Sequence, residues 1–290
     1  MKTISGSAQL RLLLSQKPLI RVMEAHNGLS GYIAENAKAI TSNSYLEFDG
    51  LWSSSLTDSL SKGKPDNAVV DITSRMLSIQ QILEVTHKPL LVDANDGGFV
   101  EHFVYTVRAL EKLNAAAVFI EDKVGLKENS LNSTINQKQD SIINFAKKIT
   151  AGKQAKETED FMIFARIESL ILGEGLKGAL LRAEAYIAAG ADGILIHSKD
   201  KSAAKILKFA KEYQHFDHKV PLAVVPTVYN QVAESTLQKV GVNIVIYANH
   251  LLRSAYKTME KTAISILNSG RAFEAEEYCI PISDFLRIIK

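Results

Sequence analysis

Acidic, amide and basic side chains recur along the sequence, each directly after a short apolar run. In chain order these residues are Glu24, His26 and Asn27; Trp52 and Ser54; Asp93 and Asn95; Glu121 and Lys123; Arg166 and Glu168; His197; Thr227; Asn249 and His250. Carboxylate, amide and hydroxyl oxygens suit a hard cation such as Mg2+, which typically takes one or two carboxylates and keeps several waters. Arg166, Lys123 and Lys127 supply positive charge for an anionic substrate, and an arginine can grip carboxylate or phosphate through two parallel hydrogen bonds.

The apolar runs are typical of strands that are buried on both faces. They occupy residues 18–27, 45–55, 89–96, 115–123, 161–169, 191–199, 220–227 and 242–250. The segments between them have helical spacing, as in the stretch from Ile72 to Leu83, where apolar residues recur three or four positions apart. Gly190 and Gly241 stand where helix C-caps are expected. This alternation predicts a (β/α)8 barrel.

We expect one barrel domain over residues 1–290. An open doubly wound sheet is the alternative, but such a sheet usually carries a glycine-rich phosphate loop after its first strand, and here MEAHNGLS follows instead. The polar stretch at about 123–139 is the longest candidate for a mobile lid over the site. A C-terminal helical segment from about residue 253 is expected to pack on a neighbouring helix or subunit.

Composition excludes several classes of protein. A formal net charge of +2 gives no reason to expect nucleic acid or an anionic membrane as a partner. The lone Cys279 excludes an internal disulfide and fits a reducing compartment. No apolar run approaches the roughly 18 residues that a membrane span needs, and the first residues resemble an amphipathic helix more than a signal peptide. A soluble, cytoplasmic protein is therefore expected.

The active site of such a barrel lies at the C-terminal ends of its strands, so these polar residues are expected to converge. An acidic residue at one strand end is most often a helix N-cap, whereas polar groups that converge from four or more strands indicate a functional cluster. For His197 a structural and a catalytic role stay equally open, and Trp52 is interpreted as a wall of the pocket. The pattern alone predicts an acidic Mg2+ site with an anion-binding rim.

These strand ends resemble the phosphoenolpyruvate mutase family of the isocitrate lyase superfamily from about Leu10 to Leu286. The matching stretches are MEAHNGLS, GLWSSSL, the VDA of the third strand, EDKVGLKENSL, ARIESLILGEGLKGALLRAEAYIAAGADGILIHSK, VVPTVY and VIYANHLLRS. The pattern EDK-x-x-x-K-x-N-S, which begins at Glu121, is the most specific of them. The family interconverts phosphoenolpyruvate and phosphonopyruvate by moving a phosphoryl group between oxygen and carbon.

The resemblance implies a role for each residue of the site. Mg2+ would be held directly by Asp93 and through its waters by Glu121 and Asp66, with Asn95 in its outer shell. The substrate contacts would come from Trp52, Ser54, Ser55 and Leu56 around the enolate, from Arg166 across the carboxylate and phosphoryl groups, and from Asn129, His197 and Lys127 at the phosphoryl group. Asp66 also stands where the family keeps a carboxylate proposed to accept or guide that group.

One position departs from the family pattern. The family usually has D-A-D-x-G-x-G after the third strand, whereas this chain has D-A-N-D-G-G. Asn95 thus replaces a second acidic group near the metal, and the loss of that charge is expected to weaken Mg2+ binding. Asp96, one residue further on, would compensate only if the loop were rearranged.

Other activities of the superfamily are the alternatives. Phosphonopyruvate hydrolase tends to carry threonine where Asn129 stands, so Asn129 favours the mutase. Carbon–carbon lyases carry a catalytic cysteine in a K-[KR]-C-G-H run, and this chain has VGLKENS there. A non-catalytic descendant of the fold is the remaining possibility. The family also implies a last barrel helix that is swapped between subunits in a homodimer or homotetramer.

Overall fold

The computed structural model describes residues 4–40, 45–131 and 137–288, so part of the expected lid, 132–136, lies outside the described residues. The chain divides into two compact units, Met1–Asn249 and His250–Lys290. The first unit holds the barrel and all the residues expected at the site except His250. The second unit contains the C-terminal helical segment, which begins at His250.

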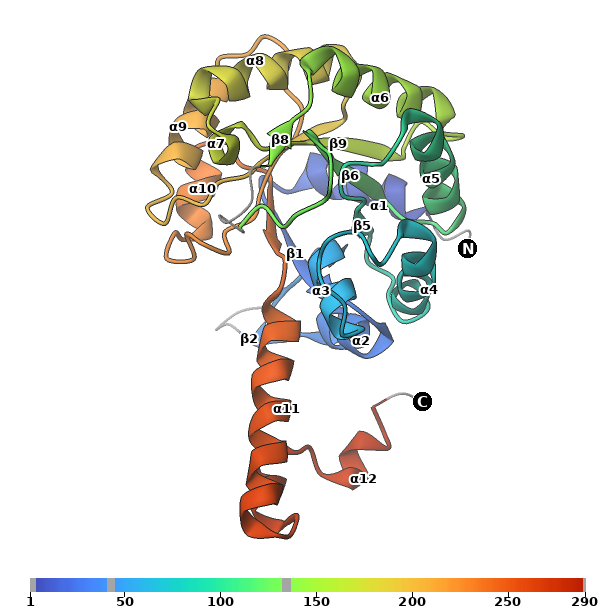
Figure 1. Ribbon diagram of the computed structural model, residues 1–290, viewed down its shortest axis with the longest axis vertical. Coiled ribbons are helices and arrows are strands. Elements are labelled where there is room, and N and C mark those ends of the chain that lie inside the picture. Colours follow the sequence, from blue (N-terminus) through green and yellow to red (C-terminus); the bar gives the residue numbers. More distant parts are fainter. Residues whose placement is uncertain (1–3, 41–44, 132–136, 289–290) are drawn as a thin grey trace. The chain divides into compact units, whose positions relative to one another are not determined.

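Parallel strands close into an eight-stranded barrel, which confirms the predicted (β/α)8 fold (Figure 1). The strands are β1 (Ile20–Ala25), β4 (Gly50–Ser53), β5 (Leu90–Asp93), β6 (Ala117–Glu121), β9 (Met162–Ile167), β10 (Gly193–Ile196), β11 (Leu222–Val224) and β12 (Ile244–Tyr247). Each pairs in parallel with both neighbours, in the order β1, β12, β11, β10, β9, β6, β5, β4. All eight strands therefore end at the same mouth of the barrel.

Large side chains fill the interior of the barrel. The ring of Phe119 on β6 stacks on Phe164 of β9 with centroids 4.2 Å apart, and Trp52 of β4 meets Phe119 edge-on at 4.9 Å. Gly193 of β10 leaves room for this packing, because a Cβ atom there would lie 2.0 Å from the Phe164 ring. The interior is a packed core and not a channel.

Helix α1 (Gly6–Gln16) covers the end of the barrel that is opposite the strand ends. Its buried Leu10 belongs to the interior core, and Leu13 and Leu14 pack against that core. Arg11 fixes the helix by donating hydrogen bonds to the carbonyl of Asp160 and to the carboxylate of Asp192, which precede β9 and β10. This arrangement confirms the amphipathic helix that the first residues predict.

The remaining helices of this unit surround the barrel in Figure 1. They are α2 (Gly28–Asn36), α3 (Ser55–Ser61), α4 (Ile72–Leu83), α5 (Val100–Lys112), α6 (Ile142–Ala155), α7 (Ser169–Leu172), α8 (Gly175–Ala188), α9 (Ala204–Tyr213) and α10 (Glu234–Lys239). The side chains of Asn27, Asp71 and Ser141 cap the first turns of α2, α4 and α6. Gly190 and Gly241 follow α8 and α10 with φ of 100° and 86°, as their predicted capping role requires.

The predicted strand 45–55 is wrong in its first half. Residues Tyr45–Glu47 form β3, which pairs antiparallel with β2 (Lys38–Ile40) in a separate two-stranded sheet, and only Gly50–Ser53 enter the barrel. Asp49 marks the break, because its carboxylate accepts hydrogen bonds from the amide of Arg21 and from Lys17. The apolar run 45–55 is therefore interrupted at Asp49, whose hydrogen-bond partners lie far away in the sequence.

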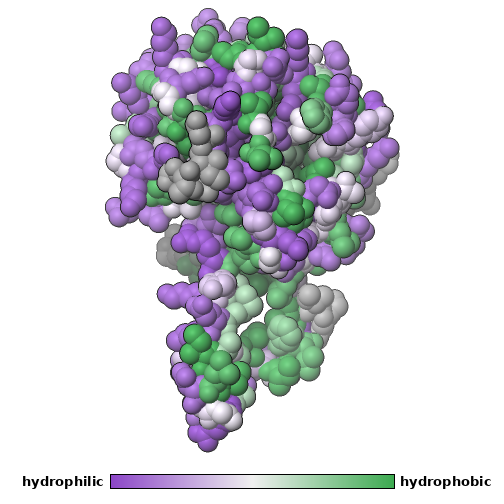
Figure 2. Space-filling model, in the orientation of Figure 1, coloured by the Kyte–Doolittle hydropathy of each residue, from purple (hydrophilic) through white to green (hydrophobic). Residues whose placement is uncertain are grey.

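The second unit consists of α11 (His250–Ser269), the 3-10 helix η1 (Phe273–Tyr278) and α12 (Ile282–Phe285). No residue of α11 is buried, and large apolar side chains of this unit such as Leu267 and Phe273 are exposed. Figure 2 shows hydrophobic residues gathered over it. The swap of the last helix between subunits stays a prediction. None of the helices in the described part of the chain combines the length and apolar character that a membrane crossing needs.

The close approach of β10 to Phe164 predicts a sharp cost for a single added methyl group. Gly193→Ala should lower the free energy of unfolding by about 1–3 kcal/mol, because the Phe164 ring has to move inside a filled barrel. Gly28→Ala is the matched control, since its Cβ would lie 3.4 Å from the nearest atom, in ordinary contact. Urea denaturation measures both variants, and equal stabilities would contradict this account of the core.

Candidate active site

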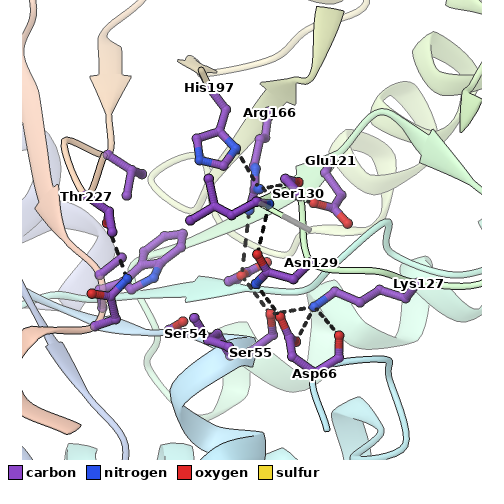
Figure 3. Close-up of a pocket in the computed structure, with 17 residues that line it drawn as sticks. Ser54, Ser55, Asp66, Glu121, Lys127, Asn129, Ser130, Arg166, His197 and Thr227 are labelled. Carbon is purple, nitrogen blue, oxygen red and sulfur yellow. Dashed lines mark hydrogen bonds and ion pairs between the residues drawn. The ribbon is translucent and has the colours of Figure 1, made fainter. Parts of the chain in front are cut away.

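A cavity opens at the C-terminal ends of the barrel strands, where the predicted residues were expected to meet. It encloses about 510 Å3 when the open space at its mouth is included. Its lining includes all the residues to which the family resemblance gives a role, except Asn95: Trp52, Ser54, Ser55, Leu56, Asp66, Asp93, Glu121, Lys127, Asn129, Arg166 and His197. In Figure 3, Arg166 and His197 from the strand ends lie close to Asn129 and Lys127 of the lid, above Asp66 and Ser55.

The turn from β4 into α3 supplies polar groups to one side of the cavity. Ser54 and Ser55 are buried, and the Ser55 hydroxyl donates to Oδ2 of Asp93 at 3.0 Å. The first backbone N–H groups of a helix have no acceptor within the helix, and Ser54 caps α3 without a side-chain hydrogen bond to them. The amides of Ser55 and Leu56 are thus donors that suit a carboxylate or enolate oxygen.

Asp93 ends β5 with its carboxylate held from several sides. Oδ1 accepts from the amide of Asn95 at 3.0 Å, and Oδ2 lies 3.9 Å from the Arg166 guanidinium. Burial alone would raise the pKa of Asp93, but the positive charges of Arg166, Lys127 and Arg75 lower it below its ordinary value. Asp93 is therefore a carboxylate that stays ionised inside the cavity.

Glu121 ends β6 beside Asp93 and is almost completely buried. Oε2 lies 3.4 Å from Nη2 of Arg166, and Oε1 forms a 3.1 Å ion pair with Lys123 but accepts no well-aligned hydrogen bond. Burial raises the pKa of Glu121 against the pull of Arg166 and Lys123. An additional positive charge near Oε1 would favour its ionised form.

Asn95 follows β5 in a left-handed conformation, with φ of 55°. Its backbone amide donates to Asp93 and its carbonyl accepts from the amide of Glu121 at 2.7 Å. Its side-chain Oδ1 is buried and has no hydrogen-bond partner in the described part of the chain. Asn95 thus links the two carboxylates through its backbone without lining the cavity.

The carboxylate oxygens at the ends of β5 and β6 suit a metal ion that keeps part of its water shell. Within the described ranges, no three histidine, cysteine, aspartate or glutamate side chains lie close enough together to hold a metal ion on their own. Asp93 and Glu121 are two neighbouring carboxylates that line the cavity, and Oε1 of Glu121, which accepts no well-aligned hydrogen bond, is a suitable acceptor for metal-bound water. Mg2+ fits this set, because it commonly binds through one or two carboxylates.

Arg166, at the end of β9, lies among carboxylates with 14% of its side chain exposed. Its Nε donates to Oε1 of Glu168 at 2.6 Å, and its Nη2 donates to the hydroxyl of Ser130 at 2.9 Å. Burial would lower the pKa of Arg166, but Glu168, Glu121 and Asp93 raise it further above its already high ordinary value. Arg166 is a permanent cation at the centre of the cavity.

His197, at the end of β10, adds a hydrogen-bonding group next to Arg166. Its Nδ1 lies 3.0 Å from Nη2 of Arg166 and 3.2 Å from Oε1 of Glu168. A guanidinium only donates, so the contact with Arg166 requires an unprotonated Nδ1. Burial lowers the pKa of His197 despite the opposing pull of Glu168, which favours the neutral ring. The contact with Glu168, which only accepts, would need the proton on Nδ1, whereas the tautomer that accepts from Arg166 carries its proton on Nε2. Such a ring donates one hydrogen bond to an anionic substrate.

The lid reaches over the cavity from the end of β6. It begins with β7 (Lys123–Val124), which pairs antiparallel with the returning strand β8 (Lys138–Gln139). Lys127 forms an ion pair with Asp66 and donates to Ser55 at 3.3 Å, while Nδ2 of Asn129 donates to Oδ2 of Asp66 at 2.7 Å. Both oxygens of Asp66 are thus engaged by the lid, and its expected contact with metal-bound water stays a prediction.

The residues predicted at the end of β1 have structural roles instead. Oε1 of the buried Glu24 lies 2.6 Å from Nδ1 of His26, and Asn27 forms a capping box with Ser30 at the start of α2. They do not line the cavity. After the adjacent strands β11 and β12, by contrast, Thr227 and Asn249 both line it.

Sequence reasoning missed Arg75, which lies directly behind the site. Arg75 is almost completely buried on α4 and donates to the carbonyl oxygens of Asp93 and, at 3.1 Å, of Ser53. It therefore ties together the ends of β4 and β5. A signal was present, because Arg75 lies on the apolar face of the predicted helix together with Ile79 and Ile82.

Asp122 is a second residue that the sequence analysis missed. It is fully buried next to Glu121, and its carboxylate accepts from the amide of Glu168 at 2.9 Å, from Gln139 at 2.7 Å and from the hydroxyl of Tyr186 at 2.9 Å. Burial raises its pKa to about 7, although these donors and Arg182 pull it down. Asp122 connects the base of the lid with the Arg166 and Glu168 pair.

Known proteins resemble the chain over nearly its whole length. A family model for phosphoenolpyruvate phosphomutase matches residues 10–267. Phosphoenolpyruvate phosphomutase of Tetrahymena pyriformis is 35% identical over 283 residues, 97% of this chain and 90% of the relative. Phosphonopyruvate hydrolase of Variovorax sp. (strain Pal2) is 34% identical over 283 residues, 96% of this chain and 93% of the relative. A crystal structure of phosphonopyruvate hydrolase with oxalate and Mg2+ superposes with a TM-score of 0.87 at 31% identity and covers 98% of this chain and 95% of that one.

Asp122 should make the stability of the fold depend on pH. Its folded pKa of about 7 exceeds the ordinary 3.8, so between these values the folded state holds a proton that the unfolded state has lost. Its contribution to stability is complete below pH 3.8 and disappears as the pH rises through 7, with a slope of up to about 1.4 kcal/mol per pH unit. Asp122→Asn should remove this slope.

Urea denaturation between pH 5 and 8 measures the effect. The wild type should lose stability with rising pH more steeply than Asp122→Asn, while the exposed Asp217→Asn keeps the wild-type slope. Parallel curves for all three proteins would mean that the surrounding donors keep Asp122 ionised in the folded state.

Proposed function

The chain belongs to the phosphoenolpyruvate phosphomutase family, and we propose that it interconverts phosphoenolpyruvate and phosphonopyruvate with the help of Mg2+. The observation that carries the proposal is the contact of Asn129 with Asp66 inside the same cavity as Arg166. The lid thus brings the asparagine that favours a mutase to the place where a phosphoryl group would transfer.

The pyruvate part of the substrate would lie between the turn after β4 and Arg166. The amides of Ser55 and Leu56 would donate to its carboxylate or enolate oxygens, and Arg166 would bridge the carboxylate and the phosphoryl group. Trp52, which is buried and lines the cavity, would limit where the enolate lies. Holding both ends in place is the main requirement of phosphoryl transfer, since it depends mostly on positioning and charge.

Asp93 and Glu121, with Asn95 behind them, would hold Mg2+. Two facts support this: the donor set described above, and the Mg2+ and oxalate in the solved structure of the related hydrolase. Bound Mg2+ would supply electrostatic stabilisation of the negative charge that develops on the substrate. The positive charge near Oε1 of Glu121 would also offset the cost of burying that carboxylate.

In the transfer itself, the bond between phosphorus and carbon of phosphonopyruvate breaks and a bond between phosphorus and the enolate oxygen forms. Asn129, His197 and Arg166 would donate hydrogen bonds to the phosphoryl oxygens while the group moves. Lys127 and Asn129 already engage both oxygens of Asp66, which favours a role in guiding the group over nucleophilic attack.

Phosphonopyruvate hydrolase is the second candidate, because a hydrolase and a mutase match the chain with almost equal identity. Asn129 favours the mutase. A carbon–carbon lyase is disfavoured, since the lid sequence VGLKENS contains no cysteine. A cytoplasmic location and assembly as a homodimer or homotetramer remain part of the proposal.

Phosphorus NMR of the purified protein with Mg2+ and phosphonopyruvate tests the function. We expect phosphoenolpyruvate as the product, and Asp93→Ala should abolish its formation because the direct metal ligand is lost. Inorganic phosphate with pyruvate would identify a hydrolase instead. Unchanged phosphonopyruvate in the wild type would refute both activities, and full activity of Asp93→Ala would refute the assignment of the metal.

Asn95→Asp tests the metal site without turnover. A carboxylate at this position adds a negative charge beside Asp93 and Glu121, so Mg2+ should bind about tenfold more tightly, as titration calorimetry of the substrate-free protein would show. Asn114→Asp is the control. Asn114 also has a positive φ, but it precedes β6 at the other end of the barrel, where its side chain accepts a hydrogen bond from the amide of Gly6. Equal affinity in both variants would mean that residue 95 does not face the cation.

A further inference from the structure

Lys123 lies beneath the lid with its ammonium group buried. Its three N–H donors meet three lid acceptors: the carbonyl of Glu128 at 2.8 Å, the hydroxyl of Ser130 at 3.0 Å and Oε1 of Gln137 at 2.8 Å. The side chain is only 7% exposed. A lysine has three donors and no acceptor, so every donor of this buried cation is used on the lid.

These contacts surround Asn129 on both sides. Glu128 and Ser130 are its two neighbours in sequence, and both bond to Lys123. The carbonyl of Asn129 itself accepts from Nε2 of Gln137 at 3.0 Å. The first part of the lid, up to Ser130, is therefore hydrogen-bonded to its returning part at Gln137, next to Asn129, which would contact the phosphoryl group.

The same ammonium also contacts the floor of the site. Nζ lies 3.1 Å from Oε1 of Glu121, and Ser130 accepts a second hydrogen bond from Arg166. Lys123 thus joins the lid to Glu121, which would hold the metal. Ser130 joins the lid to Arg166, which would hold the substrate. Such a joint favours a closed lid whenever those groups are in place.

We propose that Lys123 is a positioning residue: it holds Asn129 and Lys127 over the substrate and keeps water out of the cavity during phosphoryl transfer. This inference rests on the proposed function. An enclosed site lets the phosphoryl group pass between carbon and the enolate oxygen of one substrate molecule, with no competing acceptor.

Loss of this contact should change the products. In a wet cavity, water attacks phosphorus as the phosphorus–carbon bond breaks, so that the water oxygen enters inorganic phosphate. A water proton goes to the carbon that phosphorus has left, and this carbon becomes the methyl group of pyruvate. A weakened lid should therefore convert part of the mutase activity into hydrolysis.

Lys123→Met tests the proposal, because methionine keeps much of the volume and loses the charge and the three donors. With phosphonopyruvate we expect kcat to fall by about tenfold to 100-fold, with a smaller change in KM and a larger share of phosphate among the products. Lys138→Met is the control: this lysine lies on β8 of the same lid but is exposed. Its kcat and product ratio should match the wild type.

Chymotrypsin cleavage in the presence of Mg2+ and oxalate measures lid closure without turnover. Wild type and Lys138→Met should be protected at Leu131, and Lys123→Met should be cleaved there. Gln137→Leu, which removes a lid partner and leaves the lysine, should show the same defect and serves if Lys123→Met does not fold. The proposal would be overturned if both Lys123→Met and Gln137→Leu kept the protection and the products of the wild type. Lost protection without extra phosphate would show that the lid contact does not keep water out of the cavity.

The two measurements separate this proposal from the proposed function. If the wild type turns over no phosphonopyruvate, the function is wrong, but the cleavage pattern still decides whether Lys123 holds the lid. If the wild type forms phosphoenolpyruvate and Lys123→Met behaves identically, the function stands and the role of Lys123 is refuted.

Discussion

The guanidinium of Arg166 lies in a largely enclosed position between three carboxylates, and the organisation of the site depends on it. Glu168 bonds to it directly, while Glu121 and Asp93 lie within ion-pair distance. A cluster of charges in a protein interior is stable only while each charge has partners of the opposite sign. Arg166 also reaches the lid through Ser130 and the neighbouring strand through His197. Arg166 thus connects the carboxylates at the ends of β5 and β6, the neighbouring strand β10 and the lid.

The barrel makes this cluster possible, because residues far apart in sequence lie after strands that end at one edge. Behind that edge lies a layer of polar groups that do not contact the cavity. Arg75 joins the ends of β4 and β5, and Asp122 joins the start of the lid to Glu168. These contacts fix the backbone from which the site residues project. The precision of the site therefore comes as much from buried charges behind it as from the residues that face the cavity.

The sequence predicted most of the site because a parallel barrel obeys a simple rule: the residues directly after each strand lie at the same mouth. Apolar runs and helical spacing revealed the strands, so Asp93, Glu121, Arg166 and His197 could be predicted from the sequence. The rule does not say which way a side chain turns after the strand. Glu24 turns inward to His26, and Asn95 contributes its backbone and not its side chain to the site.

The errors have the same physical origin. The end of β3 depends on the contact of Asp49 with Arg21, and the position of Arg75 depends on the carbonyls of two strands. Both are contacts between distant parts of the chain that local periodicity does not encode.

Helix α1 closes the barrel at the end away from the strand termini, and its leucines join the core. Among the described residues, the cavity at the strand ends is therefore the opening to the site. The product of the proposed reaction would leave by the route that the substrate took, past the lid that Lys123 and Gln137 hold in place. Tight closure and quick release place opposing demands on the same few hydrogen bonds. The strength of these lid contacts would therefore set both how often the cavity opens and how well it excludes water.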